Sequence, residues 1–257
     1  MDCLVMNLVP GLVSVIMPAF NAAGYIADAV RSVQEQTYTS WELLIVDDCS
    51  TDDTFQRAKS LAAADARVRC IRLSRNSGAA VSRNRAMEIA QGQYMAFLDA
   101  DDLWLPDKLE HQLKFMRARG VAICCTAYAQ VDERGARTGR VLTSPKRVGY
   151  NRLLLDCPVG NSTVMYDVSR LGKFEVPDIR KRNDDALWLR MLKHEKYIWG
   201  IPEVLAQYRV RSDSISADKL SLVKYHWILY REIERLSVVR SAFHVAAWGF
   251  IKVLGLK

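Results

Sequence analysis

Three carboxylates follow a short apolar segment near the middle of the chain. Residues 94–98 (YMAFL) are typical of a buried strand, and Asp99, Asp101 and Asp102 come directly after it. Carboxylates gathered at the end of a strand are costly unless a cation neutralises them. Their oxygens suit Mg²⁺ or Mn²⁺, and these ions suit a diphosphate. Acidic turns after strands are common, so this pattern alone leaves a plain surface turn open.

Asp47 and Asp48 form a second acidic group, after the apolar residues 42–46 (ELLIV). A hydroxyl of residues 50–51 can cap the next helix, with the acids 52–53 in its first turn, where the helix dipole favours negative charge. Asp47 and Asp48 precede that cap. We therefore expect them to contact a ligand, through a hydrogen bond from a nucleobase N–H or a ribose hydroxyl.

Two other segments carry polar groups with a possible anion-binding role. Gly78 opens an expected helix, and its exposed N–H groups with Arg75 and Arg83 would suit a phosphate. A simple strand–turn–helix connection explains the same residues. Further along, Arg209 and Arg211 alternate at the end of an expected strand and so share one face. They are either solvated surface arginines or groups that neutralise a departing diphosphate.

A candidate general base lies in residues 183–190 (NDDALWLR). One interpretation is an ordinary helix start, with Asn183 as the N-cap and the acids compensating the dipole. Asp184, however, is three and four residues from Leu187 and Trp188, so it lies on the side of the helix that packs inward. An inward carboxylate in a cleft that also binds a metal could act as a general base.

The elements that must position these groups follow from hydrophobic periodicity. We expect strands at 12–17, 41–46, 68–73, 94–98 and 121–127, and helices at 22–36, 51–64, 79–91 (ended by Gly92), 107–119 and 183–193. Residues 132–148 are expected to form a mobile loop or hairpin, 198–210 one or two strands, and two helices close the chain. Short apolar strands that alternate with helices indicate an α/β fold, a mostly parallel sheet flanked by helices. Such sheets bind ligands at the carboxyl ends of their strands, which would bring residues 18–21, 47–48, 75–76 and 99–102 to one rim.

Length and composition favour a single large domain, residues 1–217, with a helical extension, 218–257. The chain has 257 residues, 50% hydrophobic and 25% charged, and six cysteines without a C-x-x-C spacing, as expected in a reducing compartment. Neither a signal peptide nor a membrane span is apparent, so we expect a cytoplasmic protein.

The extension is basic and rich in aromatic residues. Residues 219–257 carry seven Lys and Arg against two Glu, and Trp248, Ile251 and residues 254–255 recur at helical spacing. A helix packed on the domain is one interpretation. A helix in the interface of an anionic membrane explains the basic and aromatic residues together, which predicts a peripheral protein on the inner face of the plasma membrane. No nucleic-acid-binding signature accompanies the charge, so nucleic acid is not an expected partner.

Taken together, these segments resemble the family 2 glycosyltransferases with the GT-A fold. The segments that carry the resemblance are 13–21 (VSVIMPAFN), 46–52 (VDDCSTD), 76–84 (NSGAAVSRN), 92–102 (GQYMAFLDADD) and 183–188 (NDDALW). Their order and spacing cover roughly residues 12–210. The single-sugar transferases that build bacterial surface polysaccharides (O-antigen, capsule, exopolysaccharide) are the most similar members.

The resemblance implies a role for each matching position. Donor contacts fall on Pro18, Ala19, Phe20, Asp47, Asp48, Asn76, Gly78, Arg83, Asp99, Ala100 and Arg211. Asp101, with Asp99, would hold Mn²⁺ or Mg²⁺ on the diphosphate of a nucleotide-sugar; UDP is preferred, and GDP or dTDP stay open. Asp184 would be the base, with Asp185 as second choice. The sequence departs from the family at Asn183, usually Glu, and at Arg211, often His.

The activity that the resemblance implies is an inverting, metal-dependent transfer of one sugar to a hydroxyl of a polyprenyl-diphosphate-linked glycan. A processive synthase would need transmembrane segments and a Gln-x-x-Arg-Trp motif, and a nucleotidyltransferase would need a basic glycine-rich segment at residues 18–21; neither is present. A catalytically inactive nucleotide-sugar-binding or scaffold protein is the alternative, against which the retained Asp99, Asp101 and Asp184 argue.

Overall fold

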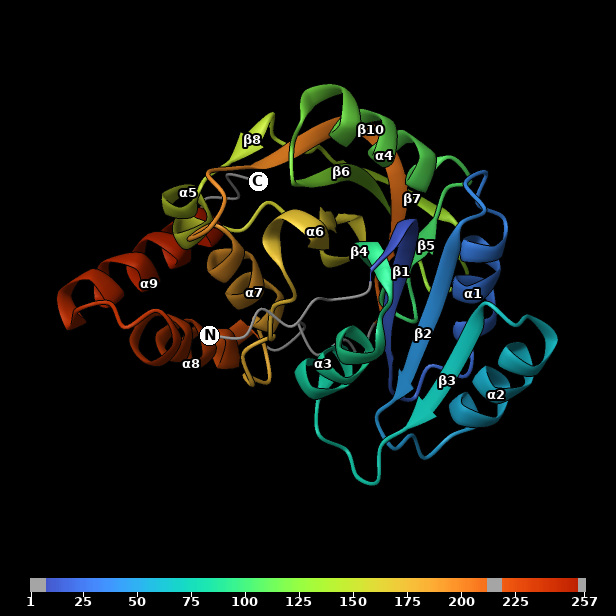
Figure 1. Ribbon diagram of the computed structural model, residues 1–257. Coiled ribbons are helices and arrows are strands. Elements are labelled where there is room, and N and C mark those ends of the chain that lie inside the picture. The colour runs from blue at the N-terminus through green and yellow to red at the C-terminus, as the bar shows by residue number, and fades with distance from the viewer. Residues whose placement is uncertain (1–7, 212–218, 254–257) are drawn as a thin grey trace, which may run out of the picture.

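The structure, a computed structural model, describes residues 8–211 and 219–253 (Figure 1). Its strands are β1 (Val9–Ala19), β2 (Trp41–Asp47), β3 (Val68–Arg72), β4 (Gly92–Phe97), β5 (Leu103–Trp104), β6 (Ile123–Val131), β7 (Arg137–Leu142), β8 (Arg147–Val148), β9 (Met165–Asp167) and β10 (Ile198–Arg209). They join one sheet in the order β3-β2-β1-β4-β9-β6-β10-β5, with β7 beside β6 and β8 beside β10.

The sheet is parallel in its first half and mixed in its second. The pairs β3–β2, β2–β1 and β1–β4 are parallel, as the alternation of strands and helices predicted. The short β9 then runs antiparallel to both β4 and β6, while β10 runs parallel to β6 and antiparallel to β5. Within residues 132–148, β7 forms a hairpin with β6, as one of the two predicted alternatives, and β8 pairs with β10. Residues 198–209 form one long strand.

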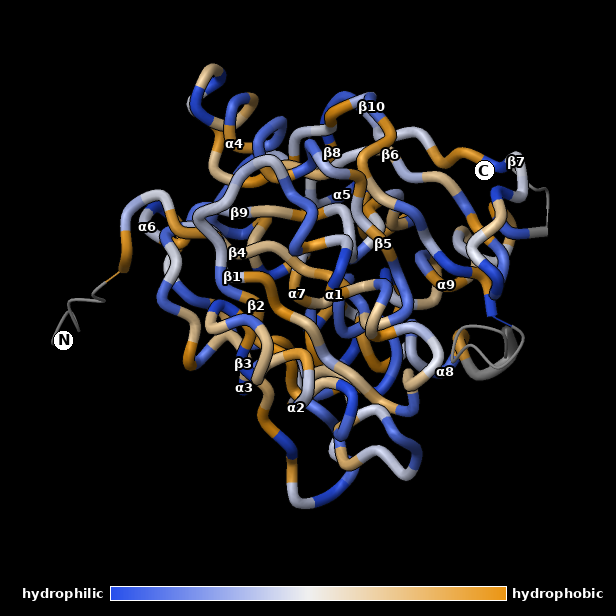
Figure 2. The backbone as a smooth tube through the Cα atoms, turned by 90° about the vertical axis from the view of Figure 1, so that its right-hand side faces the viewer, coloured by the Kyte–Doolittle hydropathy of each residue, from blue (hydrophilic) through white to orange (hydrophobic). Residues whose placement is uncertain are grey.

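Helices cover both faces of the sheet. They are α1 (Ile26–Gln34), α2 (Thr54–Ala64), α3 (Ala79–Ile89), α4 (Lys108–Arg119), α5 (Tyr150–Leu155), α6 (Val168–Leu171), α7 (Asn183–Met191), α8 (Lys219–Ile228) and α9 (Val238–Val253), with a 3₁₀ turn η1 (Asn161–Thr163) and a π turn η2 (Leu229–Ile233). Side chains alternate along β1, so Val13, Val15 and Met17 pack with α1 and α4, whereas Ile16 joins the core under α3 and α7. Figure 2 shows β1, β2 and β4 in the middle of the molecule, with hydrophobic residues along them.

Two helices begin later than predicted because their leading residues bind across a loop. The expected helix 22–36 starts at Ile26, since the Ala22 N–H donates to Thr54 Oγ1 at 2.7 Å. The expected helix 51–64 starts at Thr54, whose N–H donates to Asp52 Oδ1 at 3.0 Å. The Ser50 hydroxyl accepts the Asn21 N–H instead of capping the helix. The prediction that residues 50–51 supply the cap is therefore wrong.

The sequence suggested that Gly92 ends a helix, and this prediction is wrong. Helix α3 ends at Ile89, and Gly92 is the first residue of β4. The residue is glycine because β1 lies very close. A Cβ at Gly92 would lie 2.6 Å from Leu12 O and 2.8 Å from Ser14 N. Its N–H donates to Ser14 Oγ, which donates to Glu42 Oε1 at 2.6 Å.

We expect Gly92→Ala to lower the free energy of unfolding by about 1–3 kcal/mol, because the added methyl group must push β4 away from the β1 backbone. Urea unfolding followed by circular dichroism measures the change. Gly24→Ala is the matched control, since a Cβ there meets no atom within 4 Å. Equal unfolding midpoints for the two variants would contradict the packing at Gly92.

The closing helices pack on the domain beside α5 and α7. The Tyr230 hydroxyl, in η2, donates to Leu154 O at 2.8 Å, and the Tyr150 hydroxyl donates to Glu234. The proposed domain boundary at residues 217 and 218 falls outside the described residues, as does the 254–255 end of the expected apolar stripe. Within residues 8–211 and 219–253, none of the helices has the length and hydrophobicity needed to span a bilayer.

Candidate active site

The loops at the carboxyl ends of β1 and β2 meet the start of α3, as the rim argument predicted. The Asp48 N–H donates to Ala19 O at 2.8 Å. Its carboxylate accepts the Ser77 and Gly78 N–H groups, each at 2.7 Å. Gly78 has φ of 93°, a conformation that favours glycine. The predicted open anion site at the start of α3 is therefore wrong as far as these two N–H groups are concerned, because both already donate to the Asp48 carboxylate.

The other expected donor contacts lie along the same rim. Pro18 and Ala19 are buried at the end of β1, and the Phe20 side chain after them is exposed. The Asn76 side-chain amide donates to Asp48 O at 3.4 Å. Asp47 is buried, accepts the Ser50 N–H at 3.1 Å and so holds the loop that follows β2.

Arg83 joins the acidic segment to the helix of the candidate base. Its guanidinium lies 2.6 Å from Asp99 Oδ1 and donates a second hydrogen bond to Asn183 Oδ1. Both termini of the guanidinium therefore have protein partners, which corrects the hypothesis that Arg83 faces an open phosphate site. Asn183 is not the N-cap of α7 either: it is the first helical residue, and its side-chain amide donates to Ile179 O.

The three carboxylates after β4 divide into two kinds. Asp99 also accepts the Asn161 side-chain N–H at 2.9 Å, and Asp101 pairs with Arg211 at 3.2 Å. Both are half-buried, with Ala100 buried between them. Asp102 is buried and fully engaged, accepting the Ser162 hydroxyl at 2.5 Å and the Arg209 N–H at 2.9 Å. Asp102 therefore ties η1 to β10, and Asp99 and Asp101 stay nearer the surface.

The charges of this segment fit a divalent cation. Burial, and then repulsion from Asp99, raise the pKa of Asp101, and a bound cation would remove that cost. Among residues 8–211 and 219–253, no group of three His, Cys, Asp or Glu side chains is placed to hold a metal ion. A metal at Asp101 and Asp99 would take its other ligands from a diphosphate and water, as Mg²⁺ commonly does.

Arg209 is the last residue of β10 and Arg211 lies two residues beyond the strand, yet both side chains reach the same ring, and the solvated interpretation is wrong for Arg209. Its Nε donates to Asp101 O and its Nη1 to Glu133 O, each at 2.8 Å, and the side chain is buried. Both guanidinium groups lie 4.9 Å from the centre of the Tyr25 ring. Arg211 is thus placed against Asp101 rather than in open solvent.

Helix packing brings the candidate base toward the acidic segment. Trp188 of α7 packs edge-on against Phe97 at the end of β4, with 5.2 Å between ring centroids. Asp184 is one turn earlier on the same face of α7, and Asp99 follows Phe97 by two residues. Burial, and then the neighbouring Asp185, raise the pKa of Asp184 to about 6. Asp185 is itself held by Arg182, whose Nε lies 2.8 Å from its Oδ2.

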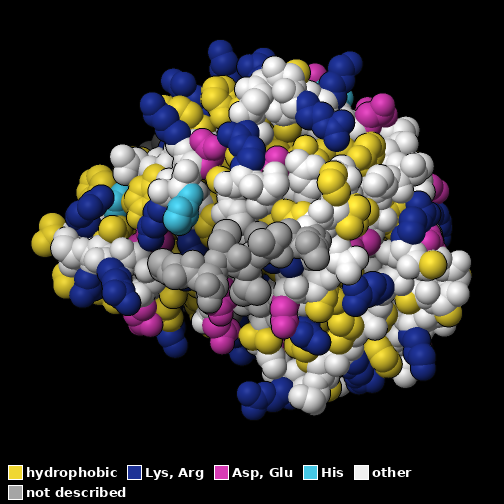
Figure 3. Space-filling model, viewed as in Figure 1, with side chains coloured by type: hydrophobic (Ala, Val, Ile, Leu, Met, Phe, Trp, Pro, Cys, Tyr) yellow, Lys and Arg dark blue, Asp and Glu magenta, His cyan; other side chains and the backbone are white. Residues whose placement is uncertain are grey.

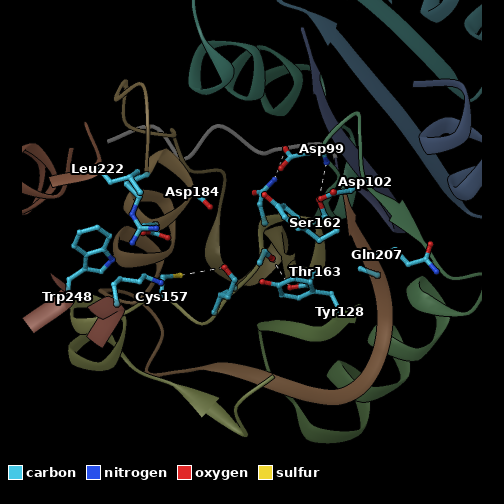
Figure 4. Close-up of a pocket in the computed structure, with 18 of the residues that line it drawn as sticks. Asp99, Asp102, Tyr128, Cys157, Ser162, Thr163, Asp184, Gln207, Leu222 and Trp248 are labelled. Atoms are coloured by element: carbon cyan, nitrogen blue, oxygen red, sulfur yellow. Dashed lines mark hydrogen bonds and ion pairs between the residues drawn. The ribbon is translucent and has the colours of Figure 1, made fainter. Parts of the chain in front are cut away.

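A cavity of about 810 Å³ connects these groups. Its lining includes Asp99, Asp102, Asp184 and Asp185, and Figure 4 shows the Asp184 carboxylate between Asp99 on one side and Trp248 on the other. Asp101 is next to this lining but not part of it. The cavity has the size of a site for a whole small ligand, with titratable groups converging on it.

Several functional residues were missed in the sequence, chiefly in η1. Asn161 and Ser162 hold Asp99 and Asp102, and η1 is fixed from behind by Trp104 Nε1, which donates to Ser162 O at 2.7 Å, and Gln112 Nε2, which donates to Thr163 O at 2.9 Å. The run of small polar residues between Val159 and Val164 is the signal that could have marked this turn. Tyr128 and Arg182, which also line the cavity, carry no local signal of their own.

Comparison with known proteins identifies the family. Residues 14–178 match the model of glycosyl transferase family 2. The chain is 43% identical over 241 residues to the putative teichuronic acid biosynthesis glycosyltransferase TuaG of Bacillus subtilis, covering 94% of each chain. It is 36% identical over 217 residues to the UDP-Glc:alpha-D-GlcNAc-diphosphoundecaprenol beta-1,3-glucosyltransferase WfgD of Escherichia coli, covering 84% of each. The chain belongs to glycosyl transferase family 2, and it is a glycosyltransferase that uses a nucleotide-sugar donor.

Solved structures confirm the GT-A fold. TarS of S. aureus, residues 1–349 in complex with UDP-GlcNAc, superposes with a TM-score of 0.70 at 18% sequence identity, over 92% of this chain and 71% of TarS. The mannosyltransferase PcManGT of Pyrobaculum calidifontis, in complex with GDP-Man and Mn²⁺, gives a TM-score of 0.65 at 18% identity, over 92% of this chain and 72% of that one.

Proposed function

We propose that this glycosyltransferase moves one sugar from a UDP-sugar to a hydroxyl of a lipid-diphosphate-linked glycan, with inversion at the anomeric carbon, during surface polysaccharide synthesis. The observation that carries the proposal is the shared cavity, which brings Asp184 together with the donor-side carboxylate Asp99. The names of WfgD and TuaG support the donor, the acceptor and the pathway.

The residues of the chain divide the chemistry as follows. The nucleotide lies along the rim of residues 18–20 and 47–48, and the sugar reaches the cavity past Asp99. Asp184 takes the proton of the acceptor hydroxyl, whose oxygen attacks the anomeric carbon as the bond to the diphosphate breaks on the opposite side. A divalent cation held by Asp101 and Asp99 would supply charge stabilisation to the diphosphate. Arg211, beside Asp101, adds a fixed positive charge for the leaving group.

A transfer assay tests this function. The full-length protein is incubated with a panel of UDP-, GDP- and dTDP-sugars, Mn²⁺ and a synthetic alkyl-diphosphate-linked sugar. We expect UDP release that depends on the acceptor and a product with one added sugar of inverted anomeric configuration by NMR. No nucleotide release from any donor, with or without acceptor, would instead support an inactive nucleotide-sugar-binding protein.

We also propose that α8 and α9 place the enzyme on an anionic membrane surface. The outward face of α9 is apolar: Val239, Phe243 and Phe250 are exposed at helical spacing. Its inward face carries Ser241 and His244. Trp248, a member of the expected apolar stripe, is also inward and buried, so it packs on the domain. Basic side chains on these helices and on the segment between them, Lys224, Arg235 and Arg240, are exposed, and Figure 3 shows hydrophobic and basic side chains together at this end of the molecule.

Replacing Phe243 and Phe250 together by Gln should weaken binding to phosphatidylglycerol vesicles by about tenfold or more, because two side chains that are 62% and 64% exposed would no longer enter the lipid. Vesicle co-sedimentation measures this loss. Val141→Gln, an exposed valine on β7, is the control and should bind normally. Equal binding by all three proteins would rule out this surface.

A further inference from the structure

The cavity extends past the candidate base to the closing helices. Beyond Asp184, its walls are formed by Cys157, Arg182, Leu222, Trp248 and Lys252. Figure 4 shows Trp248 and Leu222 on the side of Asp184 opposite Asp99. The nucleotide-sugar is expected on the Asp99 side, so a different part of the reaction must occupy this end.

Two cations at this end are each anchored by a more deeply buried carboxylate. The Arg182 side chain is 23% exposed, whereas Asp185, 2.8 Å away, is 5% exposed. The Lys252 side chain is 42% exposed, whereas Asp156, 3.8 Å away, is 2% exposed. The carboxylates therefore orient the cations while the cations stay the more accessible groups. A guanidinium and an ammonium held in this way suit phosphate oxygens.

Trp248 adds a hydrogen-bond donor beside the cations. It lies one turn before Lys252, on the same face of α9. Its ring is buried and packs 4.3 Å from the His226 ring, and its Nε1–H has no hydrogen-bond partner among the described residues. Buried indole N–H groups usually find an acceptor, and a ligand oxygen would supply one.

We propose that this end of the cavity binds the diphosphate of the lipid-linked acceptor, through Arg182, Lys252 and the Trp248 N–H. This inference rests on the proposed function, because it locates the acceptor in the same cavity. The parts of the acceptor would then lie along the cavity in the order in which they are bonded. The acceptor sugar lies at Asp184, its diphosphate at Arg182 and Lys252, and its lipid chain beyond α9, whose outward face is apolar.

A binding experiment with a short acceptor mimic tests the subsite. The full-length protein is first saturated with UDP and Mn²⁺, so that the donor side is filled, and farnesyl diphosphate, farnesol or inorganic pyrophosphate is then titrated by calorimetry. We expect farnesyl diphosphate to bind at least tenfold more tightly than either other probe. Lys252→Gln should weaken farnesyl diphosphate binding at least tenfold and leave the affinity for UDP and farnesol unchanged, whereas Lys252→Arg should retain it.

Lys59→Gln, an exposed lysine on α2 far from the cavity, is the matched control and should bind all probes normally. The subsite is overturned if farnesyl diphosphate binds no better than farnesol, or if neither Lys252→Gln nor Arg182→Gln changes its affinity. Pyrophosphate that binds as tightly as farnesyl diphosphate would overturn the assignment to a lipid acceptor. Failure of wild-type sugar transfer with this binding intact would refute the proposed function instead, so the two failures are distinct.

Discussion

Asp184→Asn should reduce kcat for sugar transfer by about 10²- to 10⁴-fold, the range expected for loss of a positioned general base. Asn is close to Asp in shape, so α7 and the cavity should keep their form, but its amide cannot take the proton of the acceptor hydroxyl. The KM for the UDP-sugar should stay within about twofold, because Asp184 acts on the acceptor and not on the nucleotide. Steady-state transfer at saturating acceptor measures both constants.

The pH dependence provides an independent check on the same residue. The pKa of Asp184 is raised to about 6, so the carboxylate is protonated and inactive as a base below that pH and ionised above it. Wild-type kcat should therefore rise with pH to a plateau above about 7, and the residual rate of Asp184→Asn should lack this rise. Asp185→Asn is the control variant. If it shows the larger loss of kcat, or if Asp184→Asn keeps the acid limb, the base has been assigned to the wrong residue.

The parallel half of the fold could be predicted because each of its strands is a short apolar segment that can be recognised from local sequence alone. Residues 13–17 and 41–46 carry apolar side chains on both faces of the strand. This pattern is typical of a strand that is covered by helices on both sides. β9 could not be predicted in the same way. It has three residues, and its place between β4 and β6 depends on partners about seventy and forty positions away in the sequence. Nothing in so short a segment distinguishes a strand from a loop.

The sequence predicts where in the sheet the candidate site lies, but it does not predict which partner each side chain of the site binds. Asp48 and Asp99 reach the rim because they follow parallel strands, a rule that uses only strand order. Which partner each group binds is decided by tertiary structure. The Ser77 and Gly78 N–H groups could equally have held a phosphate, and Arg83 meets Asn183 across 100 positions of sequence. Departure from the family pattern at Asn183 thus gives Arg83 a neutral partner in place of a carboxylate.

Asp101→Asn should lower kcat/KM for the donor by about 10²- to 10³-fold, the loss typical of removing one preorganised stabiliser of developing charge. The reason is twofold: Asn is a poorer ligand for a hard divalent cation, and Arg211 loses its ion pair. Activity of the wild-type protein should fall on chelation with EDTA and return with Mn²⁺ or Mg²⁺. The residual activity of Asp101→Asn should respond little to either treatment.

Asp102→Asn separates this role from a structural one. Asp102 accepts the Ser162 hydroxyl and the Arg209 N–H, so an amide there turns an N–H group toward a donor and should cost about 1–3 kcal/mol of stability. Asp101→Asn, at a half-buried position, should leave the melting temperature nearly unchanged while it removes the response to metal. The opposite pattern, with Asp102→Asn losing the metal response and Asp101→Asn losing stability, would reverse the assignment of the two carboxylates. Unchanged EDTA sensitivity in Asp101→Asn would place the cation on other ligands.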